Sequence, residues 1–280
     1  MRSVKTLFPL LVFVLLSLPV VAQKGEGPLD PSPPSGITPQ EIIQKFAAKE
    51  TQFKEARDNY TYRQSIKVET PEDGGTFELK WDVLFDDQGR RVENVVYAPQ
   101  PTLSLISISR EDMEDFRNVL PFVVTTAELP LYNINYLGRQ REDELNTYVF
   151  DVTPKQIDSA RRYFEGRIWV DDQDFQIVKT KGRTVPQFHL NSRKAGGKKV
   201  REENLFPAFT TWREQIDGQY WFPTYTRADD TLHFANGDVR IRETIRYENY
   251  KRFGSKVRIT YEGQELPPAQ QGKGGEQSPK

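Results

Sequence analysis

Long runs in which apolar and polar side chains alternate with a period of two dominate this chain of 280 residues. In residues 60–68, tyrosine, isoleucine and valine alternate with threonine, arginine, serine and lysine. In residues 77–85, phenylalanine, leucine, tryptophan and valine alternate with glutamate, lysine and aspartate. Such patterns are typical of antiparallel sheets with one buried face and one solvated face. The chain is therefore predicted to be mainly β.

Further runs of the same kind follow, separated by turn signals. Asp86–Gly89 ends the second run, and Asp217-Gly218 is a strong signal for a two-residue hairpin. Beyond the first two runs, strands are predicted at Arg91–Tyr97, Leu131–Arg139, Leu145–Val152, Arg162–Val170, Phe175–Val185, Phe209–Ile216, Tyr220–Thr226, Asp238–Tyr250 and Lys256–Tyr261. We expect about ten or eleven antiparallel strands in a single domain.

Two helices accompany these strands. Thr38-Pro39-Gln40-Glu41 is a capping box with proline at the first helical position, and apolar residues recur at helical spacing down to about Asp58. A second helix is predicted from Ser109, with Asp112 as its cap partner and Pro121 as its end. A third short helix or a loop follows. We expect these helices to cover one face of the sheet.

The first 22 residues have the pattern of a secretory signal peptide. Arg2 and Lys5 precede an apolar stretch, and small residues lie before a cut at Gln23. The alternative is an uncleaved membrane anchor, which needs about 20 uninterrupted apolar residues. Residues 23–37 are predicted to be a flexible linker, 38–262 the folded domain and 263–280 a disordered tail. The signal peptide leads us to expect an exported protein, and because the chain has no cysteine we expect it to carry no lipid anchor.

Composition argues against several classes of function. Cleavage removes two of 39 Lys and Arg and none of 40 Asp and Glu, so the surface is slightly acidic and no nucleic-acid partner is expected. Two histidines and the lack of cysteine leave little for metal binding or nucleophilic catalysis. No catalytic or phosphate-binding motif is present. We expect no catalytic residues, no metal site, no cofactor and no enzymatic activity; a secreted hydrolase would need a clustered acid–base pair.

The apolar side of the predicted sheet is rich in large aromatic residues. A curved sheet that few helices cover can enclose an apolar cavity, although the same residues can also fill a closed core. Glu243 interrupts the apolar side of the last long run and is expected either to pair with a basic side chain or to meet an arginine lid or a ligand head group. The basic loop 191–203 is expected to be solvated, or to contact anionic lipid or an acidic partner. The candidate cavity-lining residues are Tyr60, Tyr62, Phe77, Leu79, Trp81, Val83, Phe85, Ile241, Glu243 and Ile245.

One hairpin has a more specific pattern. Gly166-Arg167-Ile168-Trp169-Val170-Asp171-Asp172, followed by Phe175–Lys179, resembles the G-x-I-W-[IV]-D hairpin of the LolA/LolB-like superfamily of periplasmic lipoprotein carriers. Phe222-Pro223-Thr224-Tyr225 resembles the W-[FL]-P strand of lipoprotein-sorting-like members. The order of elements between Thr38 and Tyr261 also resembles that family.

This resemblance implies an open half-barrel of about eleven antiparallel strands, with helices over an apolar cavity that takes acyl chains. It implies a periplasmic, monomeric carrier of lipid or lipoprotein acyl chains, with the helices near Ile42–Phe53 and Met113–Leu120 as lids. The alternative is an interaction or sensing module on the same fold that binds envelope membrane proteins. The sequence leaves both functions open.

Overall fold

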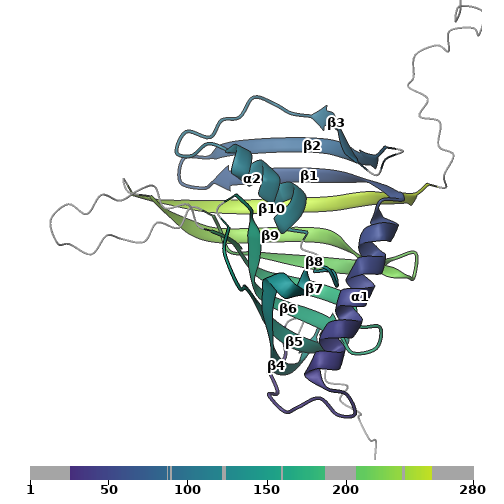
Figure 1. Cartoon of the computed structure of the whole chain (residues 1–280). Coiled ribbons are helices and arrows are strands. Elements are labelled where there is room, and N and C mark those ends of the chain that lie inside the picture. The colour runs from purple at the N-terminus through teal and green to yellow at the C-terminus, as the bar shows by residue number, and fades with distance from the viewer. Residues whose placement is uncertain are drawn as a thin grey trace, which may run out of the picture.

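A single curved antiparallel sheet forms most of the molecule. The computed structural model describes residues 26–253 except 87, 89, 122–123, 159, 187–205 and 235–236. The strands are β1 (Tyr60–Thr70), β2 (Gly75–Phe85), β3 (Arg91–Tyr97), β4 (Tyr132–Glu142), β5 (Leu145–Pro154), β6 (Tyr163–Asp171), β7 (Ile177–Val185), β8 (Phe209–Ile216), β9 (Tyr220–Phe234) and β10 (Gly237–Arg252). Figure 1 shows them stacked from β3 at one end to β4 at the other.

The strand order is β3-β2-β1-β10-β9-β8-β7-β6-β5-β4, and each neighbouring pair is antiparallel. Strands β3 and β4 lie at opposite ends of this order, so the sheet is not closed into a barrel. The predicted open half-barrel is confirmed, with ten strands. The strand predicted at Lys256–Tyr261 lies outside the described residues, as do the predicted signal peptide, the basic loop 191–203 and the C-terminal tail.

The predicted hairpin between β8 and β9 is also present. Asp217 and Gly218 are both in the left-handed region, with φ of 55° and 66°. Three residues, 217–219, separate the two strands instead of the predicted two, since Ile216 pairs with Tyr220. Gln219 N donates to Ile216 O at 3.3 Å, so Asp217 and Gly218 are the central residues of a turn whose positive φ angles match the twist of the strands.

Helix α1 (Pro39–Arg57) lies across the concave face of the sheet (Figure 1). It begins at the predicted capping box, in which Thr38 and Glu41 each cap the other's backbone. Phe46 contacts Phe150 of β5 edge-to-face, and the buried Glu50 carboxylate accepts two hydrogen bonds from Arg213 of β8, at 2.9 and 3.2 Å. The helix is therefore an integral part of the core.

The second predicted helix consists of α2 (Arg110–Glu114) and a π-helical turn, η1 (Asp115–Val119). Ser109 and Asp112 form its capping box. Its last turns connect two strands that are separated by β10 and β9, since Phe116 O accepts from Gln64 Nε2 of β1 and Leu120 O accepts from Thr211 Oγ1 of β8. A single 3₁₀ turn, η2 (Leu129–Leu131), precedes β4.

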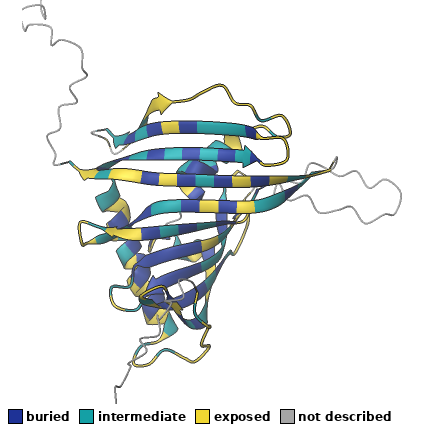
Figure 2. Ribbon diagram, turned by 180° about the vertical axis from the view of Figure 1, so that it is seen from behind, coloured by how far each residue is buried: buried dark blue, intermediate teal, exposed yellow. Residues whose placement is uncertain are grey.

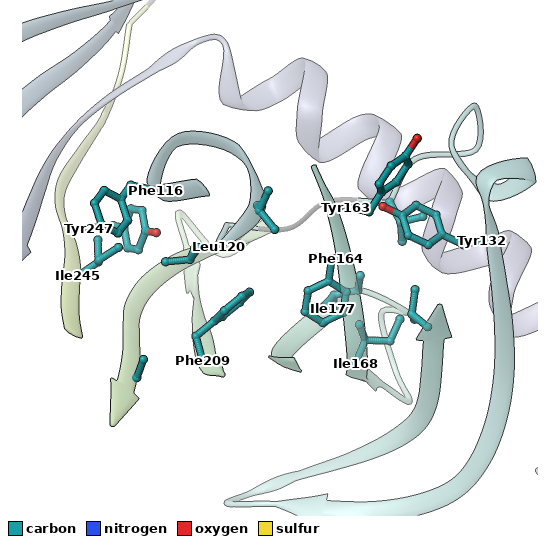
Figure 3. Close-up of a cluster of buried hydrophobic side chains, with 14 of the residues drawn as sticks. Phe116, Leu120, Tyr132, Tyr163, Phe164, Ile168, Ile177, Phe209, Ile245 and Tyr247 are labelled. Atoms are coloured by element: carbon teal, nitrogen blue, oxygen red, sulfur yellow. The ribbon is translucent and has the colours of Figure 1, made fainter. Parts of the chain in front are cut away.

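The main core lies between the helices and the concave face. Along β1, every second residue is buried, as the period-two pattern predicts (Figure 2). Figure 3 shows Phe116 and Leu120 beside Ile245 and Tyr247, and Phe164 beside Ile177 and Ile168 deeper in the sheet. These side chains fill most of the concave face.

Residues 26–32, which the sequence predicts to be part of a flexible linker, run along the edge strand β4. Asp30 exchanges two backbone hydrogen bonds with Arg139, and Gly27 N donates to Arg141 O. The buried Lys179 donates to Glu26 and to Glu142 at 2.9 and 2.7 Å. Gly138 permits this approach, because a Cβ atom there would lie 2.2 Å from Asp30 O. The segment thus covers an otherwise unpaired strand.

Candidate functional site

A partly open pocket of about 800 Å³ lies where α2 meets the ends of β9 and β10. Its walls come from segment 103–109, from α2, from residues 206–207, and from β1, β9 and β10. The apolar lining residues are Val68, Leu103, Leu105, Ile106, Ile108, Phe116, Phe206, Pro207, Leu232, Phe234 and Ile241. A pocket of this size and lining falls within the range of about 300–1,000 Å³ that is typical of small-molecule sites.

Among the polar lining residues, one buried carboxyl group stands out, that of Glu243. Glu243 of β10 is only 5% exposed, and its Oε1 atom has no hydrogen-bond partner within the described part of the chain. Its strand neighbours are Val68 on β1 and Ala228 on β9, neither of which has a polar side chain. Of the two arrangements expected from the sequence, pairing with a basic side chain is not found among the described residues.

Two further carboxyl groups surround Glu243. Asp112 accepts hydrogen bonds from Ser109 N and Oγ, both at 2.7 Å, and Asp115 is paired with Arg162 at 2.6 and 3.0 Å. Burial raises the pKa of both aspartates above the ordinary value. Burial, together with repulsion from Asp112 and Asp115, raises the pKa of Glu243 to about 8. At neutral pH this carboxyl is therefore mostly neutral.

Two of the ten candidate residues, Ile241 and Glu243, line this pocket. The structure places the others elsewhere on the same sheet. Tyr60 packs against Phe222 with ring centroids 4.7 Å apart, and Tyr62 stacks on Tyr250 at 5.1 Å. Leu79, Val83 and Ile245 are buried in the main core, against which Phe77 and Phe85 pack.

Trp81, the largest of the candidate residues, is held in a polar network beneath η1. Its Nε1–H donates to Gln64 Oε1 at 2.8 Å, and the guanidinium of Arg117 lies 5.2 Å from its ring centroid. Arg117 in turn forms two hydrogen bonds with Glu93 of β3, both at 2.9 Å. These contacts join β1, β2, β3 and η1, so Trp81 holds the helical turn on the sheet.

Most residues that line the pocket were not predicted from the sequence. Segment 103–109, Leu-Ser-Leu-Ile-Ser-Ile-Ser, has no strand or helix in the structure but supplies seven lining residues. The alternation of apolar residues with serines in this segment was the signal that could have indicated an apolar wall. Leu232 and Phe234 were missed because the predicted strand ended at Thr226, whereas β9 continues to Phe234.

A second hollow of about 600 Å³ lies on the other side of α2 and is more polar. Its charged lining residues are Lys54, Arg57, Arg110, Glu114, Glu128, Arg161 and Arg162. Lys54 and Arg161 both lie within 4.0 Å of Glu128, so part of this positive charge is compensated.

In the described ranges, no group of three or more Asp, Glu or His side chains could hold a metal ion. No helix among the described residues is both long enough and apolar enough to span a bilayer.

Searches against known proteins found similar structures only. No family model matches the chain. No curated protein sequence matches it. Three similar solved structures are a LolA superfamily protein from Nitrosomonas europaea (16% identity, TM-score 0.37), a DUF1329 family protein from Desulfovibrio piger (13%, 0.40) and a domain described as an outer membrane lipoprotein-sorting protein from Vibrio parahaemolyticus (10%, 0.38).

These alignments cover 78%, 76% and 77% of this chain and 94%, 92% and 95% of the respective neighbours. At such identities and TM-scores, none of them carries an argument about this chain. One of the three belongs to the LolA superfamily, whose hairpin pattern residues 166–172 resemble.

Proposed function

We propose that this protein is a non-enzymatic, exported binding protein that takes a lipid or another molecule with an acyl chain into the pocket beside α2. The observation that carries the proposal is the 800 Å³ pocket, whose lining is mostly aliphatic and aromatic. Each methylene group transferred from water into such surroundings contributes about 0.8 kcal/mol. The signal-peptide pattern of residues 1–22 supports a periplasmic location.

The way in for a ligand lies beside α2 and segment 103–109. Helix α1 is held by the buried Glu50–Arg213 pair, with both side chains only 1% exposed, so its displacement would leave two buried charges unpaired. Segment 103–109 and the five-residue α2 make fewer buried contacts, since α2 has no buried residue of its own. We therefore assign the lid role to α2 with segment 103–109, and a structural role to α1.

Native mass spectrometry tests the proposal on protein purified without detergent from cells that express the full chain. We expect co-purified lipid, or uptake of an uncharged fluorescent alkyl probe when the pocket is empty. Ile106→Glu places a charge in the pocket wall and is expected to reduce uptake at least tenfold. Val95→Glu, at a side chain that is 56% exposed on β3, is the matched control. Equal uptake by a folded Ile106→Glu variant and the parent protein would contradict the proposal.

The uncovered edge of the sheet favours a second candidate function, the binding of an envelope protein partner. Among the described strands, β3 pairs with β2 alone, and its Val92, Val95, Val96 and Tyr97 are 44–56% exposed (Figure 2). An exposed apolar edge strand can accept an extended segment of another protein.

A photo-crosslinking side chain placed at Val95 in producing cells tests this second function. We expect one discrete adduct with an envelope protein. The same probe at Thr244, on the convex face of the central strand β10, is expected to give none. Identical crosslinking at the two positions would exclude β3 as a specific partner site.

A further inference from the structure

The Glu243 carboxyl group is unusual because it lies in a mostly apolar pocket and has no partner among the described residues. It is 5% exposed, and its Oε1 atom accepts no hydrogen bond from any of them. Burying a polar group without a hydrogen bond is unfavourable. Such a group in the wall of a pocket points to a ligand that supplies the missing partner.

The charges around Glu243 restrict the chemistry of that ligand. On α2 and η1, Asp112 and Asp115 face it, and Arg162, just before β6, is engaged with Asp115. On β10 itself, Tyr247 lies four residues further along on the same face, and burial raises the pKa of its hydroxyl well above the ordinary value for tyrosine. No lysine or arginine is among the described lining residues of the pocket. The environment therefore repels an anionic head group and favours a cationic one.

The geometry also argues against a metal ion. Asp112 is occupied as the cap of α2 and Asp115 by Arg162, and no three carboxylates within the described chain come together as ligands. A buried single carboxylate with a neighbouring second carboxylate suits a primary ammonium group, which presents three hydrogen-bond donors. The adjoining apolar walls suit an attached hydrocarbon chain.

We propose that the pocket selects an amphiphile with a protonated primary amine, whose ammonium group donates to Glu243 and whose hydrocarbon chain lies along Leu232, Ile241 and Phe206. This assignment rests on the proposed function and specifies the ligand class for the same pocket. On binding, Glu243 releases its proton to water and the ammonium keeps all three of its protons. The ion pair thus replaces a neutral, unpartnered carboxyl group.

Three ligands of equal chain length test the assignment: decylammonium, 1-decanol and decanoate, each titrated into the full-length protein by calorimetry below its aggregation concentration. We expect decylammonium to bind at least tenfold more tightly than decanoate at pH 8. Between pH 6 and 8 its affinity is expected to rise, approaching tenfold per pH unit, because Glu243 must lose a proton to pair. The affinity of decanol is expected to stay nearly constant.

Glu243→Gln removes the charge with little change in shape. We expect this variant to bind decylammonium at least tenfold more weakly at pH 8 and without the rise with pH, while decanol binds as before. Glu248→Gln, at an exposed carboxylate on the opposite face of the same strand and outside the pocket, is the matched control and is expected to behave as the parent. His233 lies between the lining residues Leu232 and Phe234, and its Nδ1 atom is hydrogen-bonded to Asp238 at 2.9 Å. A change of decylammonium affinity with pH that persists in Glu243→Gln would therefore be assigned to His233 and Asp238.

The possible results separate the two proposals. Binding of decanol or decanoate with no preference for decylammonium would overturn the amine assignment and leave the apolar pocket intact. Failure of all three ligands to bind would overturn the proposed function as well. Displacement of decylammonium by millimolar Ca²⁺ or Mg²⁺ would indicate a metal site instead. If Glu243→Gln did not fold, a flat pH profile in the parent protein would still refute the assignment.

Discussion

At the scale of single residues, Glu243 shows how far the sequence can identify a functional group. Its interruption of an apolar run on β10 is visible in the sequence, and its burial follows from that position. Its neighbours are not visible in the same way, because Asp112 and Asp115 come from a helix about 130 residues earlier in the chain. Only the tertiary structure shows that carboxylates, rather than basic side chains, surround it.

This burial makes the stability of the protein depend on pH. The pKa of Glu243 is about 8 in the folded protein, against an ordinary value of 4.5, so the unfolded chain ionises first as the pH rises. Stability from this group is therefore complete below about pH 4.5 and is lost as the pH rises toward 8, by at most about 5 kcal/mol. We expect Glu243→Gln to raise the unfolding free energy by a few kcal/mol at pH 8.5 and to change it little at pH 4.5.

Urea denaturation at several pH values measures this difference. The exposed Glu248→Gln variant serves as a control and is expected to shift the unfolding free energy by less than about 0.5 kcal/mol at every pH. If the unfolding free energies of the parent and of Glu243→Gln differed by the same amount at every pH between 4.5 and 8.5, the carboxyl group would ionise in the folded state as it does in the unfolded chain. That result would contradict the prediction.

At the scale of elements, the sequence predicted correctly those boundaries that are determined by residues next to them in the chain. The bounds of β3 and β8 match the prediction, and α1 begins at the Thr38 capping box because side-chain caps act within a few residues. The end of β9 was not predictable in this way. Residues 227–234 include several charged residues, and they form a strand because β10 pairs with them as far as Gly237–Phe234. The pocket depends on this extension and on a segment without regular structure, so most of its lining could not be predicted.

The attachment of α1 to the sheet gives a second prediction at this scale. Arg213→Met would leave the Glu50 carboxylate buried without its two hydrogen bonds, which are 2.9 and 3.2 Å long. We expect a loss of about 3–5 kcal/mol in unfolding free energy. The double variant Glu50→Gln, Arg213→Met is expected to recover a large part of it, as urea denaturation would show. A loss for the double variant as large as the sum of the single losses would mean that the two side chains are energetically independent.

At the scale of the whole molecule, the two edges of the open sheet differ. Residues 26–32 cover β4 through backbone hydrogen bonds and the Lys179 contacts. In the part of the chain that the structure describes, no segment covers the free edge of β3 in this way, and β3 exposes apolar side chains. A sheet that protects only one edge leaves the other available for pairing, and this asymmetry underlies the second candidate function.

The strand order also determines when the molecule can fold. Strands β1–β3 and β4–β10 form two meanders that meet only between β1 and β10, where Tyr60 pairs with Arg252. Contacts between such distant positions carry a large loop-closure entropy and slow folding. During synthesis from the N-terminus, the first meander must wait for nearly the whole domain before its inner edge finds a partner. A chain that ends before β10 would therefore contain two incomplete sheets with unpaired, aggregation-prone edge strands. Correct folding would depend on preventing these edges from pairing wrongly until β10 has been synthesised.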